Sequence, residues 1–155
     1  NFKYFENYYS YFIAIGDNLI RSKKSKFLNS RQIKQINIIH QDSSVSENLK
    51  LGYGNFIGRN ASINSSVEIG NNAIINTSAI VEHGCKIESD VHVAPGAVIC
   101  GAVKIKKGAF VGANAVIKEN LCIGKNAIIG AGSVVLENIP DNTLSYGNPS
   151  KNKLF

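Results

Sequence analysis

Aliphatic residues recur at every sixth position from Val45 to Val135, and the residue four positions further on is mostly small. A period of six fits neither the 3.6-residue turn of a helix nor the two-residue alternation of an amphipathic strand. It predicts a triangular solenoid, in which each side is one short strand followed by a tight corner. The leading aliphatic positions are Val45, Leu51, Ile57, Ile63, Ile69, Ile75, Val81, Ile87, Val93, Ile99, Ile105, Val111, Ile117, Ile123, Ile129 and Val135.

Three such hexads make one coil of eighteen residues, so residues eighteen apart stack on one another. The sixteen hexads up to Pro140 then give just over five coils. The predicted fold is therefore mainly β, a left-handed parallel β-helix over residues 44–140. We expect residues 141–155 to form a C-terminal cap, because the last coil of a solenoid otherwise exposes apolar side chains and strand edges.

Residues 1–43 carry a different pattern, which predicts a small N-terminal domain. The apolar run Tyr11–Ile15 suits a strand, a helix follows to about Asn29, and Ile36–Ile39 suits a second strand. This order indicates a partial βαβ unit of Rossmann type. The Gly16–Asn18 turn lies where open parallel sheets bind ligands. It is equally well explained as a plain turn with a helix cap.

Composition narrows the function classes. The formal net charge is +6, with basic residues concentrated before residue 35, at Arg21, Lys23, Lys24, Lys26, Arg31 and Lys34. This cluster predicts either a solvated helix face or attraction of an anionic substrate such as a nucleotide or coenzyme A. No basic cluster is interleaved with aromatic residues along the solenoid, so we do not expect nucleic acid as a partner.

Cellular location is predicted from the absence of targeting signals and from the cysteines. No apolar run is long enough to span a bilayer, and no signal-peptide pattern occurs. The chain begins at Asn1 and contains no Met, so we expect a piece of a longer protein. Cys85, Cys100 and Cys122 fit no zinc spacing, and free thiols suit a cytoplasmic protein. Cys85 occupies a small inward position and is predicted to be a core residue.

The three histidines are the candidates for chemistry. His40 lies in the linker to the solenoid, where we expect a structural role, whereas His83 and His92 lie on solenoid flanks. The latter two are half a coil apart, so they can share a site only if they come from neighbouring subunits. Gly101 follows His83 by eighteen residues and stacks on it, which pairs a possible base with a backbone N–H for an oxyanion. With no third flank histidine, a zinc site of the γ-carbonic anhydrase kind is not expected.

Residues Ile75–Ile87, Val91–Ala97 and Gly101–Ile105 resemble the NeuD/PglD family of hexapeptide-repeat sugar acetyltransferases. The segment Phe12–Arg21 and the tail Gly147–Ser150 are also similar to that family. The resemblance implies an acetyl-CoA-dependent acetyltransferase that modifies the amine of a UDP-linked 4-amino sugar in bacterial glycan precursor synthesis. It also implies a homotrimer with active sites between subunits, and no metal.

The resemblance implies a role for each matched residue. His83 matches the family's general base, His92 a histidine at the acetyl end of the site, and the Gly101 N–H a donor to the thioester oxygen. Other matched positions bind ligands by the same resemblance. Asn76 lies beside the sugar, Gly16, Asp17 and Asn18 lie near the nucleotide, and Phe110, Val111, Gly112 and Ala113 lie along the pantetheine arm of acetyl-CoA.

One departure from the family concerns the residue after His83. The family usually has Glu or Asp there, which raises the pKa of the base and orients its ring, whereas this chain has Gly84. This departure leaves open a catalytically weakened solenoid that binds acetyl-CoA only. O-acetylation of sialic acid or a related sugar also stays open, because nothing in the sequence separates amine from hydroxyl acceptors.

Overall fold

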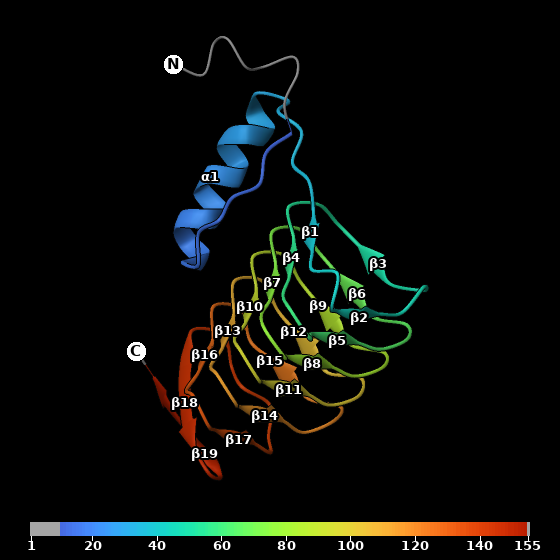
Figure 1. Ribbon diagram of the computed structural model, residues 1–155. Helices are drawn as coiled ribbons and strands as arrows, with labels where there is room; N and C mark the ends of the chain where they lie inside the picture. Colours follow the sequence, from blue (N-terminus) through green and yellow to red (C-terminus); the bar gives the residue numbers. More distant parts are fainter. Residues whose placement is uncertain (1–9, 155) are drawn as a thin grey trace.

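The computed structural model describes residues 10–154, which form a three-sided parallel β-solenoid with a helix packed against it (Figure 1). Each side is one sheet. From β1 to β17 the strands have two residues each, and neighbouring strands on a side are eighteen residues apart. The hexad prediction is confirmed: the leading aliphatics from Ile57 onward are all buried and form one continuous core with the small residues four positions on.

The strands are divided among three sheets, one on each side of the solenoid. The eight-stranded sheet contains β1 (Ile38–Ile39), β4 (Phe56–Ile57), β7 (Ile74–Ile75), β10 (His92–Val93), β13 (Phe110–Val111), β16 (Ile128–Ile129), β18 (Thr143–Gly147) and β19 (Ser150–Leu154). The six-stranded sheet contains β2 (Ser44–Val45), β5 (Ser62–Ile63), β8 (Ile80–Val81), β11 (Val98–Ile99), β14 (Val116–Ile117) and β17 (Val134–Val135). The five-stranded sheet contains β3 (Lys50–Leu51), β6 (Glu68–Ile69), β9 (Lys86–Ile87), β12 (Lys104–Ile105) and β15 (Cys122–Ile123).

The corners between sheets depend on a left-handed backbone conformation. A residue with positive φ stands three positions after each leading aliphatic from Leu51 to Ile129. These residues are Gly54, Asn60, Ser66, Asn72, Ser78, Gly84, Asp90, Gly96, Ala102, Gly108, Asn114, Asn120, Asn126 and Gly132. Gly, Asn and Asp adopt this conformation at the lowest cost, which explains why they dominate these positions. The six-residue period is therefore set by the corner as much as by the core.

The N-terminal segment differs from the prediction. The helix is present as α1 (Asn18–Ser30), with the Asp17 side chain accepting a hydrogen bond from the Ile20 N–H at 2.8 Å as its N-cap. The second predicted strand, however, becomes β1, which pairs with β4 and begins the solenoid. A single parallel bridge between Tyr11 and Gln35 joins the ends of the helical segment. Within residues 10–154 there is thus one helix and no separate Rossmann-type sheet, because Ile38 and Ile39 pair with the solenoid instead.

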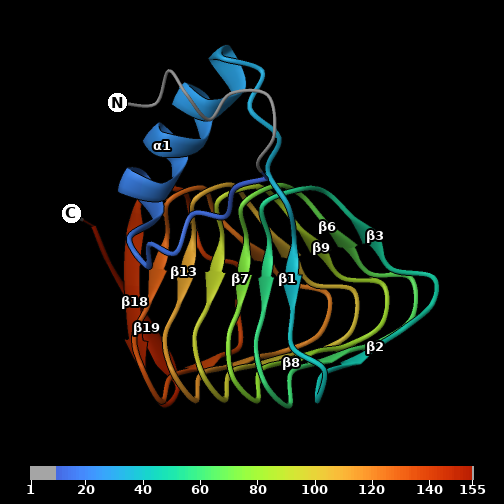
Figure 2. The same cartoon turned by 45° about the horizontal axis from the view of Figure 1, so that its top comes forward.

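The chain ends on a hairpin. Strand β18 extends the eight-stranded sheet beyond β16 and turns back as antiparallel β19. Its inward residues Thr143 and Ser145 are fully buried against the last coil. Figure 2 shows the hairpin at one end of the solenoid and α1 outside the side that carries β7 and β13.

Candidate active site

His83 lies at the corner that follows β8, and its imidazole ring covers the backbone of Gly101 one coil further on. A Cβ atom added to Gly101 would lie 2.8 Å from both Cε1 and Nε2 of the ring. The corresponding corner position carries a side chain in the other coils, as at Ser65 and Glu119. Glycine at 101 is therefore required by the histidine rather than by the corner, and the predicted stacking of these two residues is confirmed.

The surroundings of His83 suit a base that acts on an incoming ligand. The side chain is exposed, and its ring has no hydrogen-bond partner among residues 10–154. It lines a groove of about 450 Å³ together with Asn64, Ser65 and Glu82. In the described part of the chain the Gly101 N–H is also without a partner. The free imidazole thus lines this groove, and the free amide belongs to the residue that the ring covers, one coil further on.

Asn64 and Ser65 were missed by the sequence analysis. They lie eighteen residues before Glu82 and His83 and therefore stack directly beneath them in the previous coil. The coil period alone would have found them.

His92 lies on a different side of the solenoid, on the outer face of β10. Its ring is half-buried, and Nδ1 lies 3.4 Å from the Gly16 carbonyl oxygen. Its Nε2 lies 3.2 Å from Nδ2 of Asn76, and Phe110 packs edge-to-face against it at 5.1 Å. Burial lowers the pKa of His92, with a smaller contribution from the charge of Arg21. The structure thus brings four of the predicted binding residues together here, whereas His83 lies apart on another side.

The Gly16–Asn18 turn adjoins this cluster, and much of it is engaged within the protein. Asp17 is the helix cap, and Asn18 Nδ2 donates to the carbonyl oxygens of Gly108 and Ala109 at 3.0 and 3.1 Å. The turn still lines a cavity of about 420 Å³ with Phe110. The turn therefore caps a helix and also borders a cavity, and ligand binding at the turn stays a prediction.

The other three residues predicted along the pantetheine arm differ in what they present. The Val111 side chain is fully buried in the core, so only its backbone faces outward. A Cβ on Gly112 would lie 2.5 Å from the Ala131 nitrogen, so this glycine is needed for coil stacking. Ala113 is half-buried at the next corner.

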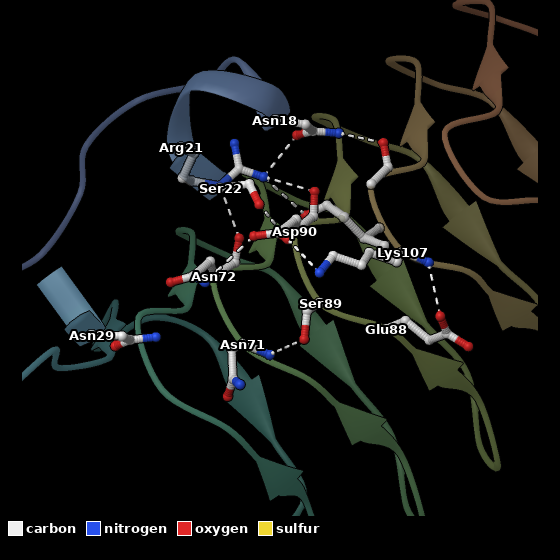
Figure 3. Close-up of polar contacts among 12 residues, drawn as sticks. Asn18, Arg21, Ser22, Asn29, Asn71, Asn72, Glu88, Ser89, Asp90 and Lys107 are labelled. Atoms are coloured by element: carbon white, nitrogen blue, oxygen red, sulfur yellow. Dashed lines mark hydrogen bonds and ion pairs between the residues drawn. The ribbon is translucent and has the colours of Figure 1, made fainter. Parts of the chain in front are cut away.

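The basic cluster divides into two kinds of residue. Lys23, Lys24, Lys26, Arg31 and Lys34 are exposed, as a solvated helix face requires. Arg21 is not part of this face, because it is 1% exposed and hydrogen-bonded to the Gly16 carbonyl of the turn. It also bonds backbone carbonyls of the solenoid, at Asn72 and Asp90 (Figure 3). The composition of the sequence could not reveal that Arg21 is buried, because its carbonyl partners belong to the main chain.

The remaining predicted residues have mainly structural surroundings. His40 Nδ1 accepts a hydrogen bond from the Asp42 N–H at 3.1 Å, within the linker. Cys85 is buried in the core, as predicted, where desolvation raises the pKa of its thiol. Across the described residues, no three His, Cys, Asp or Glu side chains are grouped as metal ligands. No described helix has the length and apolar character needed to cross a membrane.

Comparison with known proteins identifies the class. The sequence model of the bacterial transferase hexapeptide family (six repeats) matches residues 66–101 and 102–137. A solved structure superposes with a TM-score of 0.92 and 35% identity over 93% of this chain and 69% of its own. The chain therefore belongs to the bacterial hexapeptide transferases and is an acyltransferase.

That solved structure is a mutant of perosamine N-acetyltransferase from Caulobacter crescentus, with CoA and GDP-perosamine bound. The acetyltransferase domain of PglB from Neisseria gonorrhoeae, solved with acetyl coenzyme A, is 30% identical over 92% of this chain and 69% of that chain, at a TM-score of 0.90. WeeI from Acinetobacter baumannii is 29% identical over 93% of this chain and 70% of its own, with a TM-score of 0.90. No curated protein sequence matches the chain. The narrower assignment to the NeuD/PglD group stays a prediction.

Proposed function

We propose that this protein is an acetyl-CoA-dependent N-acetyltransferase that acts on a nucleotide-linked amino sugar, with His83 as the general base. The observation that carries the proposal is the free His83 ring lying over the backbone of Gly101 beside a polar groove. The relatives bound to CoA, acetyl-CoA or GDP-perosamine support the same donor and acceptor classes.

In the proposed reaction, His83 takes a proton from the acceptor amine as its nitrogen attacks the acetyl thioester. The N–C bond forms, the S–C bond breaks, and the leaving sulfur takes the proton from His83, so coenzyme A leaves as the thiol and the base is regenerated. The Gly101 N–H stabilises the negative charge that develops on the thioester oxygen. Transfer is direct, with no acyl-enzyme.

We also propose that His92, Asn76 and Phe110 bind the donor and acceptor across a subunit boundary in a homotrimer of left-handed solenoids. His83 and His92 lie on separate sides of one chain, so one site needs two chains to contain both. The six-stranded sheet offers an apolar contact surface, because its outward residues Ile80, Val98, Val116 and Val134 are aliphatic and only half-buried. The five-stranded sheet instead presents a ladder of ion pairs, such as Lys50–Glu68 at 2.7 Å.

The oligomer is tested by light scattering on the purified chain. We expect a trimer, and Val116→Asp on the apolar surface should give monomers and lose activity. A monomeric and active wild-type protein would refute the shared site.

The activity is tested by thiol release from acetyl-CoA with UDP- and GDP-linked 4-amino sugars as acceptors. We expect acceptor-dependent release that His83→Ala reduces by about 10²–10⁴-fold, which is the usual contribution of a general base. His40→Ala is the matched control, because that histidine is bonded within the linker. Release that required sialic acid instead of an amino sugar, or that survived His83→Ala, would refute the proposal.

A further inference from the structure

The hydrogen bonds around His92 fix which of its ring nitrogens carries the proton. The Gly16 carbonyl can only accept, so the ring must donate to it from Nδ1. On the other side, the Thr77 N–H donates to Oδ1 of Asn76 at 2.8 Å. This contact turns the Asn76 NH₂ group toward His92, so Nε2 must be an acceptor. Two backbone groups of fixed polarity thus hold a neutral ring with its hydrogen on Nδ1.

The Gly16 carbonyl is itself held by Arg21. The Nη1 atom of this buried arginine donates to the carbonyl oxygens of Gly16 and Ile15 at 2.9 and 3.0 Å. Its Nε atom donates to the Asn72 carbonyl at 2.8 Å, and Nη2 donates to the Asp90 carbonyl at 3.1 Å (Figure 3). Asn72 and Asp90 are the corner residues that precede β7 and β10, and Asn76 follows β7 while His92 lies in β10. One guanidinium therefore fixes the turn relative to the two coils that carry the amide and the imidazole.

We propose that Arg21 is a positioning residue of the acyl transfer, which acts through the Gly16 carbonyl to hold His92 as the Nδ1–H tautomer. A ring in this state has an electron pair and no hydrogen at Nε2, and the Asn76 NH₂ group donates to that pair. A ligand group that takes the place of this amide at Nε2 is therefore an N–H or O–H donor, such as an amide of the pantetheine arm or a group of the sugar. This inference rests on the proposed function, in which His92 adjoins the reacting groups. The lowered pKa of His92 agrees with a neutral ring.

The test is the tautomer of His92, read from long-range ¹H–¹⁵N correlation spectra of the full chain labelled at histidine. The chain has three histidines, and His92→Gln identifies the signals of this one. We expect the Nδ1–H tautomer in the wild-type protein. In Arg21→Met, the Nε2–H tautomer should appear, and kcat/KM should fall by about 10²-fold, as expected for a displaced group. Arg21→Lys should restore part of both, because an ammonium group can still donate to the Gly16 carbonyl.

Ser22→Ala is the matched control. Ser22 neighbours Arg21 and its Oγ bonds the buried Asp90 carboxylate at 2.8 Å, but it does not touch Gly16. This variant should keep the tautomer and stay within about twofold of wild-type kcat/KM. An Nε2–H tautomer in the wild-type protein would overturn the proposal without any variant, and so would an unchanged tautomer in folded Arg21→Met. An Nδ1–H tautomer in a protein without transferase activity would refute the proposed function instead.

Discussion

Replacing Gly101 by alanine tests the pairing of His83 with the backbone beneath it. The added methyl group would lie 2.8 Å from Cε1 and Nε2 of the ring, closer than real Cβ atoms approach other atoms. Restoring normal contact requires the ring to move by about 1 Å, and a displacement of this size costs about 10²-fold in rate. We therefore expect kcat to fall by about 10²-fold.

Stability should change little in this variant. The exposed ring can rotate away, at an off-rotamer cost of about 0.5–1.5 kcal/mol. Alanine in place of glycine offsets this by about 0.4–1 kcal/mol, because it restricts the unfolded chain. The corner accepts a Cβ, as Ser65 and Glu119 demonstrate at the same corner of other coils. The free energy of unfolding should thus stay within about 1 kcal/mol of wild type.

The assay combines steady-state kinetics with urea unfolding in two backgrounds. In His83→Ala the clash is absent, so adding Gly101→Ala there should stabilise the protein by about 0.4–1 kcal/mol. Wild-type kcat in Gly101→Ala would refute the reasoning. So would a loss of several kcal/mol that persisted in the His83→Ala background, since the strain would then belong to the corner.

Three further predictions follow from the core, the half-buried imidazole and the corner after His83. Ile117→Ala, at a fully buried leading position, should lower the free energy of unfolding by about 2–5 kcal/mol in urea titrations, and a loss below about 1 kcal/mol would contradict the continuous core. Folding lowers the pKa of His92. The contribution of this histidine to the free energy of unfolding is therefore present above about pH 6.5, and it is lost as the pH falls through the lowered pKa of the folded protein. Wild type should therefore lose more stability than His92→Gln between pH 8 and pH 5, and equal losses would contradict the assigned pKa direction. Gly84→Asp should shift the pH–rate profile to higher pH than Gly84→Asn does, because a carboxylate beside the base favours its charged form. The corner should accept either side chain, because an added Cβ has no neighbour closer than 3.9 Å and Asp90 adopts a similar φ of 64° at an equivalent corner.

The repeat could be predicted from sequence because each hexad carries the same short-range signal. Core positions such as Ile99, and the stacking of Gly101 on His83, followed from counting in sixes and eighteens. The role of Arg21 did not follow from the pattern, because its carbonyl partners belong to the backbone of distant corners. Strand β1 was misplaced because Ile38 and Ile39 suit any parallel sheet, and only the structure shows that they pair with β4.

Helix α1 has a consequence for how the solenoid unfolds. In a stack of repeats, each coil contacts only its neighbours, so the array can come apart one coil at a time from an end. Asn18 and Arg21, however, bond the carbonyl groups of Asn72, Asp90 and Gly108, which are corner residues of three successive coils. These three coils should therefore open together, and hydrogen exchange should find them as a single cooperative block that contains His83 and His92.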